Sequence, residues 1–361
     1  MRSLLVATLV PALVLTASPR AAVAQSQSTP AQPAGLGTDA YPKHVDAKTD
    51  KAVQKGLDWL AKNQTQDGDW SNSQDGAAYP LSMAALAGMA FLANGNTTSR
   101  GPYAENVRKV VHYCLSHAQP NGLITSAAQE QGRPMYGHGF SLMFLASAYG
   151  METDPKTRES MRRVIEKAID LTARGQSPIG GWTYIPGGGD EGSVTVTQIQ
   201  GLRAAQNAGF TVPKGVIEES VRYLERCKTP EGGIQYAFNS PTGPRLAISA
   251  AAIATLYNAG EYDSKLADDC LNFVWKNFKE SKEDWNAFGH GFYAHLYAAQ
   301  AFYQAGDEYW DDYFPGARDK IIKMQAANGS WNGDGVGPVY GTAVALTILQ
   351  LPYKFLPIYQ R

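Results

Sequence analysis

Residues 56–70 read GLDWLAKNQTQDGDW, a helical stretch that runs into a tight glycine turn and ends on a tryptophan. Variants of this turn recur along the chain, and each carries one apolar anchor. The anchors are Trp70, Ile124, Trp182, Ile234, Trp285 and Trp331, a mean step of roughly 52 residues. A unit of two helices cannot bury its apolar faces alone, so successive units must stack. The sequence therefore predicts six stacked helical repeats.

Each repeat contains two kinds of helical stretch. The first kind, such as residues 51–62, alternates apolar and charged side chains at helical spacing, which indicates a half-solvated outer helix. The second kind, such as residues 81–93 and 247–259, is rich in alanine and has almost no charged side chains. Such helices must be covered on most sides, and their small side chains let neighbouring backbones approach closely. We expect them to form an inner layer.

The repeats predict an all-α, closed (α/α)6 toroid of six outer–inner helix pairs that spans residues 47–361. Because every repeat uses the same connection, the inner helices should run parallel and begin at one end of the ring. An open superhelix is the alternative, but it needs polar terminal repeats. The last repeat, residues 342–351, is too apolar for that role.

The N-terminal residues predict an exported chain. Residues 1–24 have a basic start, an apolar run and the small-residue pattern of a signal-peptide cleavage site. Residues 25–46 are rich in Ser, Gln, Pro and Ala and read as a flexible linker. We therefore expect a periplasmic or extracellular protein with no integral membrane span after cleavage, although the apolar run could also be kept as an anchor.

Charge and cysteine content exclude several other classes. The net charge is −1 and the basic residues are scattered, which argues against a nucleic-acid partner. Cys114, Cys227 and Cys270 fall on expected outer helices at a spacing that suits no metal site. We expect buried free thiols and no metal or other cofactor, and nothing in the sequence names a protein partner.

The segment 56–70, with Gln64 and Gly68-Asp69-Trp70, resembles the Gln-Trp repeat of squalene–hopene cyclases and protein prenyltransferase β subunits. Residues 323–331 are a second, shorter match. The resemblance to this terpenoid cyclase and prenyltransferase superfamily implies the same toroid, with the Gln side chain tying a helix end to the Trp ring. It also implies a pocket at the centre of the ring, near the N-terminal ends of the inner helices.

Departures from that superfamily limit the function that the resemblance implies. The Asp-x-Asp-Asp acid motif of the triterpene cyclases is absent, and Asp311-Asp312 lies at the wrong end of the ring to replace it. Asp268 and Cys270 look like part of the prenyltransferase zinc site, but they precede the turn and belong to an outer helix. The third ligand of that site would fall near Gly341, which cannot bind metal.

Two similar pentapeptides mark the expected pocket mouth. Residues 136–140 read YGHGF and residues 288–292 read FGHGF, and both are expected to open inner helices. Helix N-termini at this end should also favour anions. The candidate catalytic residues are His138, Asp190 and His290. The candidate ligand-binding residues are Tyr79, Tyr136, Glu191, Arg245, His295 and Tyr340.

An acid beside two imidazoles could form a general acid–base set. The alternative is that each His satisfies free backbone groups at a helix start and that Asp190 or Ser193 caps the third inner helix. Repeats two and five lie opposite each other, which leaves about 14 Å between facing Cα atoms. Joint metal ligation by His138 and His290 is therefore disfavoured.

These observations leave three functions open. The first is a toroid whose centre binds an apolar or elongated small molecule or lipid, such as an isoprenoid-like one. The second is a polysaccharide lyase or hydrolase, with Arg245 neutralising a uronate of an oligosaccharide ligand and His138 moving a proton. The third is a non-catalytic interaction module. Whether the chain is an enzyme stays open at this point.

Overall fold

The computed structural model describes residues 41–126, 130–240, 242–281, 284–285 and 289–360. Its outer helices are α1 (Ala47–Asn63), α4 (Ala104–Ser116), α6 (Pro155–Arg174), α8 (Lys214–Cys227), α10 (Lys265–Ser281) and α12 (Asp307–Met324). Its inner helices are α3 (Pro80–Ala93), α5 (Pro134–Tyr149), α7 (Gly192–Asn207), α9 (Leu246–Ala259), α11 (Gly291–Ala305) and α13 (Pro338–Gln350). The short elements are α2 (Gln74–Ala78), η2 (Leu351–Tyr353) and η3 (Pro357–Tyr359). The described residues form an all-α structure, with only isolated β-bridges.

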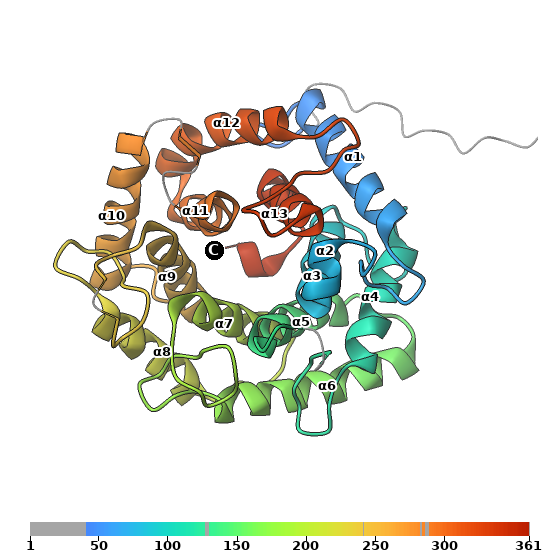
Figure 1. The fold of residues 1–361 in the computed structure, drawn as a ribbon, viewed down its shortest axis with the longest axis horizontal. Helices are drawn as coiled ribbons and strands as arrows, with labels where there is room; N and C mark the ends of the chain where they lie inside the picture. Colours follow the sequence, from blue (N-terminus) through green and yellow to red (C-terminus); the bar gives the residue numbers. More distant parts are fainter. Residues whose placement is uncertain (1–40, 127–129, 241, 282–283, 286–288, 361) are drawn as a thin grey trace, which may run out of the picture. The chain divides into compact units, whose positions relative to one another are not determined.

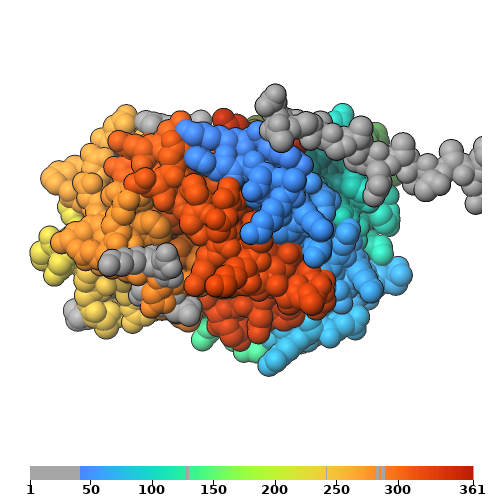
Figure 2. All heavy atoms as spheres, turned by 90° about the horizontal axis from the view of Figure 1, so that it is seen from above, coloured from blue at the N-terminus to red at the C-terminus, as the bar shows by residue number. Residues whose placement is uncertain are grey.

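The inner helices form a closed ring (Figure 1). Each one packs against both of its neighbours in chain order, and α13 returns to pack against α3. In the outer layer α12 contacts α1, and Figure 2 shows these two segments side by side on the wall of the ring. The predicted closed toroid is confirmed, and the open superhelix is excluded.

The two layers differ in burial as their sequences predict. Every residue of α3 is buried, whereas α8 buries only one face. Small residues are required where the inner helices touch. A Cβ on Gly88 of α3 would lie 2.5 Å from Cε2 of Phe144 on α5, which is closer than packed carbon atoms approach.

The glycine turns bring each repeat into contact with the next outer helix. Gly180 has a φ of 96°, and a Cβ on it would lie 2.1 Å from the carbonyl oxygen of Glu219 in α8. Gly329 has a φ of 95° and faces the carbonyl of Lys55 in α1 in the same way, at 2.5 Å. Glycine meets both demands, since it tolerates positive φ and has no Cβ. The turn is thus also the joint between repeats.

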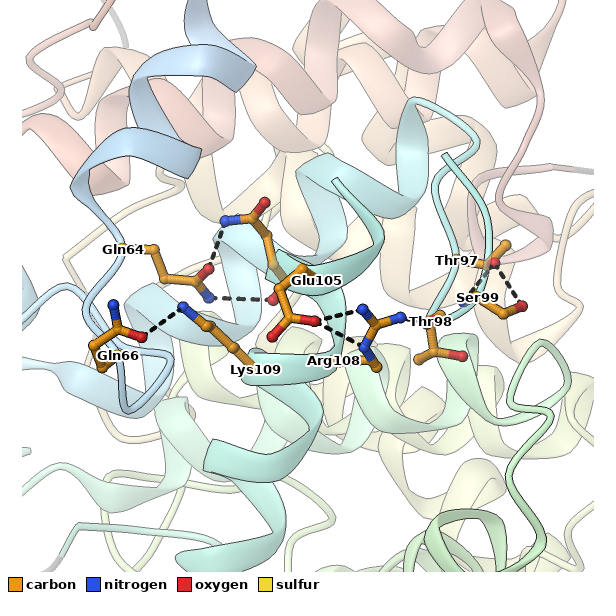
Figure 3. A network of polar contacts seen from close by, with 9 residues as sticks. Gln64, Gln66, Thr97, Thr98, Ser99, Glu105, Arg108 and Lys109 are labelled. Carbon is orange, nitrogen blue, oxygen red and sulfur yellow. Dashed lines mark hydrogen bonds and ion pairs between the residues drawn. The ribbon is translucent and has the colours of Figure 1, made fainter. Parts of the chain in front are cut away.

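The Gln-Trp pair works differently from the expectation. Gln64 Nε2 donates to the carbonyl of Gly68 in its own turn (3.1 Å) and to the carbonyl of Asn106 in α4 (3.2 Å). Figure 3 shows Gln64 reaching α4. The indole of Trp70 donates instead to Leu60 of α1, at 2.9 Å. The Gln side chain therefore ties its turn to the next outer helix, and the Trp ring bonds to its own outer helix.

The same arrangement recurs in repeats three and six. Gln176 Nε2 donates to Gly180 and to Val216 of α8 at 2.8 and 2.9 Å. Gln325 Nε2 donates to Gly329 and to Ala52 of α1, both at 2.9 Å. The Gln325 bond to α1 joins the last repeat to the first and completes the outer ring.

The chain after α13 turns back into the ring. Lys354 adopts a φ of 60°, and Phe355 then packs on Gly95, just beyond the end of α3. Leu356, Ile358 and Tyr359 are buried, and η3 contacts α7. Figure 1 shows η3 inside the ring of inner helices. We call the end at which the inner helices begin the N-terminal rim, and the other end, where this segment enters, the C-terminal rim.

The structure also locates the N-terminal residues and the cysteines. The predicted signal peptide and most of the linker lie outside the described residues, but residues 41–46 contact α12, where Lys43 pairs with Asp311 at 2.7 Å. The predicted buried free thiols are confirmed for all three cysteines. Asp268 and Cys270 lie on outer helix α10, as expected. In the part of the chain that is described, no helix combines the length and apolar character of a membrane span.

Candidate functional site

Carboxylates cap the starts of inner helices at the N-terminal rim, and three of these caps come from the following repeat: the buried Asp75 and Glu130 and the part-buried Asp334. Asp75 Oδ2 accepts from the N–H groups of Val339 and Tyr340 in α13, at 2.8 and 3.0 Å. Glu130 Oε1 accepts from the N–H of Leu81 in α3, at 2.9 Å. The last repeat caps α11 in the same way: the two Asp334 oxygens accept from residues 292 and 293 at 3.0 and 2.9 Å. The caps link the repeats in one rotational sense around the ring.

Repeat three supplies its own cap. Glu191 is the N-cap residue of α7, and its oxygens accept from the N–H groups of Ser193 (2.9 Å) and Val194 (2.5 Å). The start of α7 is still joined to the following repeat, because the N–H of Gly192 donates to the carbonyl of Tyr236 at 2.9 Å. The positive ends of four inner helices are therefore already occupied by carboxyl groups of the chain itself. This arrangement opposes the binding of an anionic ligand, which the sequence had led us to expect at this rim.

Tyrosines gather around Glu191. Tyr136 and Ser193 share a hydrogen bond of 2.5 Å between their hydroxyls, and Ser193 Oγ donates to Glu191 Oε2 at 2.5 Å. The hydroxyls of Tyr184 and Tyr236 are also 2.5 Å apart. Burial raises the pKa of Glu191, while the hydrogen bonds from Ser193 and Val194 act in the opposite direction. Burial likewise raises the pKa of Tyr136. The cluster is a connected chain of proton-bearing groups at the N-terminal rim.

Two more tyrosines line the lumen below this cluster. Gln200 of α7 and Gln300 of α11 bond across the ring at 2.6 Å, so these side chains face the lumen. Tyr293 and Tyr297 precede Gln300 by seven and three positions and lie on the same face of α11. Their hydroxyls are buried and have no hydrogen-bond partner among the described residues. A buried hydroxyl without a partner is costly, so these two groups mark a place where a ligand would be stabilised.

The electrostatic neighbours of Tyr293 show which predicted residues come together. Burial raises the pKa of Tyr293, and Tyr136, Glu191 and Tyr340 all add to the rise. Tyr340 also donates a hydrogen bond of 3.3 Å to Asp334. The structure thus brings three of the predicted ligand-binding residues, Tyr136, Glu191 and Tyr340, to one place.

His138 lies in a different environment. Its Nδ1 accepts from the N–H of Ile124 at 3.2 Å, and its Nε2 bonds to Thr172 Oγ1 of outer helix α6 at 2.9 Å. The side chain is fully buried between the two layers, and this burial lowers its pKa to about 4. In other repeats a hydroxyl does the same work: Thr195, for example, accepts from the N–H of anchor Trp182 at 3.0 Å. The geometry matches the alternative in which His138 satisfies a free N–H.

The two histidine pentapeptides are not equivalent, contrary to the sequence-based expectation. His138 is the fifth residue of α5, whereas His290 is the N-cap of α11 and is exposed. The fifth residue of α11 is His295, which stacks on anchor Trp285 with ring centres 3.7 Å apart and bonds to the Tyr313 hydroxyl at 2.9 Å. His295 therefore faces the outer layer. Phe288, which begins the second pentapeptide, lies outside the described residues.

The remaining candidates lie around the outside of the cluster. Asp190 accepts from the N–H of Phe238 at 2.8 Å and so holds the next loop. Arg245 is exposed, with its guanidinium 4.9 Å from the ring centre of Tyr236. The Tyr79 hydroxyl donates to Gln131 at 3.2 Å. His290 lines a cleft of about 680 Å³ together with residues that include Trp285 and Asp334. The three predicted catalytic residues, His138, Asp190 and His290, are not brought together.

Sequence reasoning missed part of this site. The cap residues Asp75, Glu130 and Asp334 and the lumen-facing Tyr293 and Tyr297 were not among the candidates. A signal for the caps was present, since each of the three acids lies four or five positions before an inner helix that begins with proline. The repeats taken singly do not reveal this signal, because each of these acids caps the helix of another repeat.

Comparison with known proteins supports the fold. No family model and no curated protein matches the sequence. The structure is similar to type II terpene cyclase MstE from Scytonema in complex with geranylgeranyl dihydroxybenzoate, with a TM-score of 0.56, 14% identity, and 86% of this chain and 98% of that chain covered. It is similar to a glycosidase in complex with glucose, with a TM-score of 0.56, 12% identity, and 87% and 100% covered. A protein from Actinoplanes matches with a TM-score of 0.55, 15% identity, and 85% and 99% covered. The chain has a terpenoid cyclase-like α/α toroid fold, which a glycosidase also has.

Proposed function

We propose that this protein binds an apolar, isoprenoid-like ligand in the lumen of its ring, with the polar end of the ligand at the tyrosine cluster of the N-terminal rim. The observation that carries the proposal is the pair of buried hydroxyls of Tyr293 and Tyr297 on the lumen face of α11, which have no hydrogen-bond partner among the described residues. A ligand that offers one oxygen to these phenols would remove the cost of their burial.

The charge at the rim supports a neutral ligand over an anionic one. Glu191, Asp334 and the other caps place negative groups at the helix starts, and the aromatic faces nearby favour apolar or positively charged groups. The fold match to a terpene cyclase that holds a geranylgeranyl compound agrees in ligand class. For any proton transfer we propose the chain of Glu191, Ser193 and Tyr136, because these groups are hydrogen-bonded to one another beside the lumen.

A binding measurement tests this proposal. The probes are geraniol and geranylgeraniol, titrated into the purified chain and followed by calorimetry. We expect binding of at least one alcohol, and an affinity loss of about fivefold in Tyr293→Phe and in Tyr297→Phe, which corresponds to the loss of one hydrogen bond of about 1 kcal/mol. Tyr303→Phe is the matched control, because Tyr303 lies on the same helix but packs on Trp310 of α12. Absence of binding by both alcohols would refute the proposal.

A carbohydrate-active function is the second candidate, and one observation favours it. The same fold occurs in a glycosidase that binds glucose, and Tyr184 and Tyr236 offer aromatic rings near the rim of the kind that pack against sugars. An arginine lies over each ring: the guanidinium of Arg133 is 4.7 Å from the ring centre of Tyr184, and that of Arg245 is 4.9 Å from the ring centre of Tyr236. Chromatography of neutral and uronate oligosaccharides after incubation with the protein would reveal cleavage, and Arg245→Ala should then change the preference for uronates. Unchanged oligosaccharides would leave the isoprenoid proposal as the better one.

Export is also a proposal, and it rests on residues 1–24. Fractionation of cells that express the full chain tests it, since an exported protein is recovered outside the cytoplasm and a cytoplasmic one is not.

A further inference from the structure

The chain itself enters the lumen at the C-terminal rim. Residues 355–360 follow α13 through the C-terminal rim and place Leu356, Ile358 and Tyr359 among the inner helices, where they are 2%, 2% and 5% exposed. Figure 1 shows η3 of this segment within the ring. Residues 355–359 carry apolar or aromatic side chains, and the lumen takes up three of them.

Apolar burial, and not hydrogen bonding, holds this segment in place. The hydrogen bonds of its described residues run within the segment, from the N–H of Tyr359 to Leu356 and from the N–H of Gln360 to Pro357, both at 3.1 Å. The Gln360 side chain also bonds to Leu356, at 3.5 Å. Among the described residues, none of these bonds reaches an inner helix. Another apolar chain could therefore replace the segment without leaving polar groups of the ring unpaired.

The segment lies near the proposed ligand site, because η3 contacts α7, whose Gln200 side chain faces the lumen. Tyr359 is close enough to Tyr297 to contribute to the raised pKa of Tyr297, which burial mainly causes. Tyr297 is the seventh residue of α11, about 9 Å along the helix from the N-terminal rim. A ligand that ends above this level leaves residues 355–360 in place, whereas a longer one must enter the space that they occupy.

We infer that residues 355–360 occupy the subsite for the distal end of a long isoprenoid chain, so that this segment and a long ligand exclude each other. The inference rests on the proposed function. It makes the segment a determinant of ligand length: short chains bind with the segment in place, and long chains bind only when it is displaced. The apparent affinity for a long chain then equals the intrinsic affinity multiplied by the fraction of molecules in which the segment is displaced.

The test measures the binding of two ligands of different length to three proteins. These are the natural chain, a shortened chain that ends after Lys354, and the full-length variant Ile358→Asp. The substitution keeps the segment but opposes its burial, because an unpaired charge is costly inside the ring. We expect the Kd of geranylgeraniol to fall at least about tenfold in both altered forms, as for a segment that is in place nine-tenths of the time. The Kd of geraniol should change less than about twofold. Circular dichroism and thermal unfolding identify any form that has lost its fold, and the other altered form then decides.

The outcomes separate the inference from the proposed function. If geranylgeraniol binds all folded forms equally, the inference is overturned and the proposed function stands. If neither alcohol binds any form, both are overturned. A second readout is the thiol reactivity of Gln360→Cys, since the three natural cysteines are buried. Saturating geranylgeraniol should accelerate labelling of this thiol and geraniol should not, and equal labelling rates would contradict the inference.

Discussion

The two rims of the ring are built from opposite ends of the same helices, yet they differ in chemistry. At the N-terminal rim, carboxylates such as Asp75 and Glu130 bind the free N–H groups of inner helices, and phenols surround Glu191. At the C-terminal rim, Leu356 and its neighbours close the lumen by apolar contact. Helix starts present donors that need partners when they are buried. One rim is therefore polar, directional and sensitive to pH, whereas the other depends on the size and fit of apolar side chains.

The largest expected effect comes from removing a carboxylate cap. Asp75→Ala should lower the free energy of unfolding by about 4 kcal/mol, because the N–H groups of Val339 and Tyr340 lose their acceptor in a buried site. Urea unfolding measures this change. The matched control is Asp154→Ala, which removes the exposed cap of α6 and should cost about 1 kcal/mol. Equal losses in the two variants would show that burial at the rim does not matter.

The polar rim should also give stability a dependence on pH. Burial raises the pKa of Glu130 to about 7 in the folded chain, above its value in the unfolded chain. The folded state therefore binds this proton more tightly, so the stabilising contribution is complete below the unfolded pKa and is lost as pH rises through 7. As the pH rises from below the unfolded pKa of Glu130 to above 7, the free energy of unfolding of the natural chain should fall by about 3 kcal/mol more than that of Glu130→Gln.

Urea unfolding at several pH values, with the exposed Glu231→Gln as control, measures this difference. Parallel pH profiles for the natural chain and Glu130→Gln would contradict the assignment.

The apolar rim should respond to side-chain size. Leu356→Ala removes a buried side chain and should lower the free energy of unfolding by about 2 kcal/mol, with the same loss at pH 5 and pH 8. Phe355→Ala is the neighbouring control, because Phe355 is 50% exposed and should contribute well under 1 kcal/mol. A loss that varied with pH would remove the contrast between the two rims.

The smallest expected effect on the free energy of unfolding is that of Tyr293→Phe. Comparing this variant with His138→Ala distinguishes a side chain that binds ligand from one that supports the fold. Tyr293→Phe removes a buried hydroxyl that has no partner among the described residues, so stability should stay the same or rise by up to about 1 kcal/mol. His138→Ala should instead destabilise the protein without changing ligand affinity, because His138 bonds to Ile124 and Thr172. Thermal unfolding and calorimetry on both variants test this. A stable His138→Ala with lost ligand binding would return that residue to the site.

The toroid was predictable because its determinants are local. Each repeat carries its own amphipathic stretch, glycine turn and apolar anchor. In the turn of the third repeat, for example, Gly180 adopts a φ of 96°, which glycine tolerates. The third Gln-Trp copy was not singled out, although Gln176 and Trp182 stand at the same spacing as Gln64 and Trp70. Its function became evident only from the bond between Gln176 and α8.

The site was less predictable because its parts come from different repeats. Tyr136, Glu191 and Tyr340 were among the predicted candidates, since each lies at the start of an inner helix. The role of Asp334 depends on which repeat precedes its own in the ring, and a single repeat does not carry this information. The histidine pentapeptides misled because a match of five residues does not fix which helical turn the residues occupy, and His295 rather than His290 is the counterpart of His138.

The bond from Gln325 to Ala52 limits how such a protein can evolve. In open arrays of repeats, units can be gained or lost at an end with little effect on the others, because each repeat contacts only its neighbours. Here the sixth unit must meet the first at a fixed angle, so losing one unit would narrow the whole circle and deprive residues 355–360 of their space. The number of repeats is therefore expected to stay at six during evolution. Sequence changes are expected mainly in the loops, at helix ends and in residues 355–360.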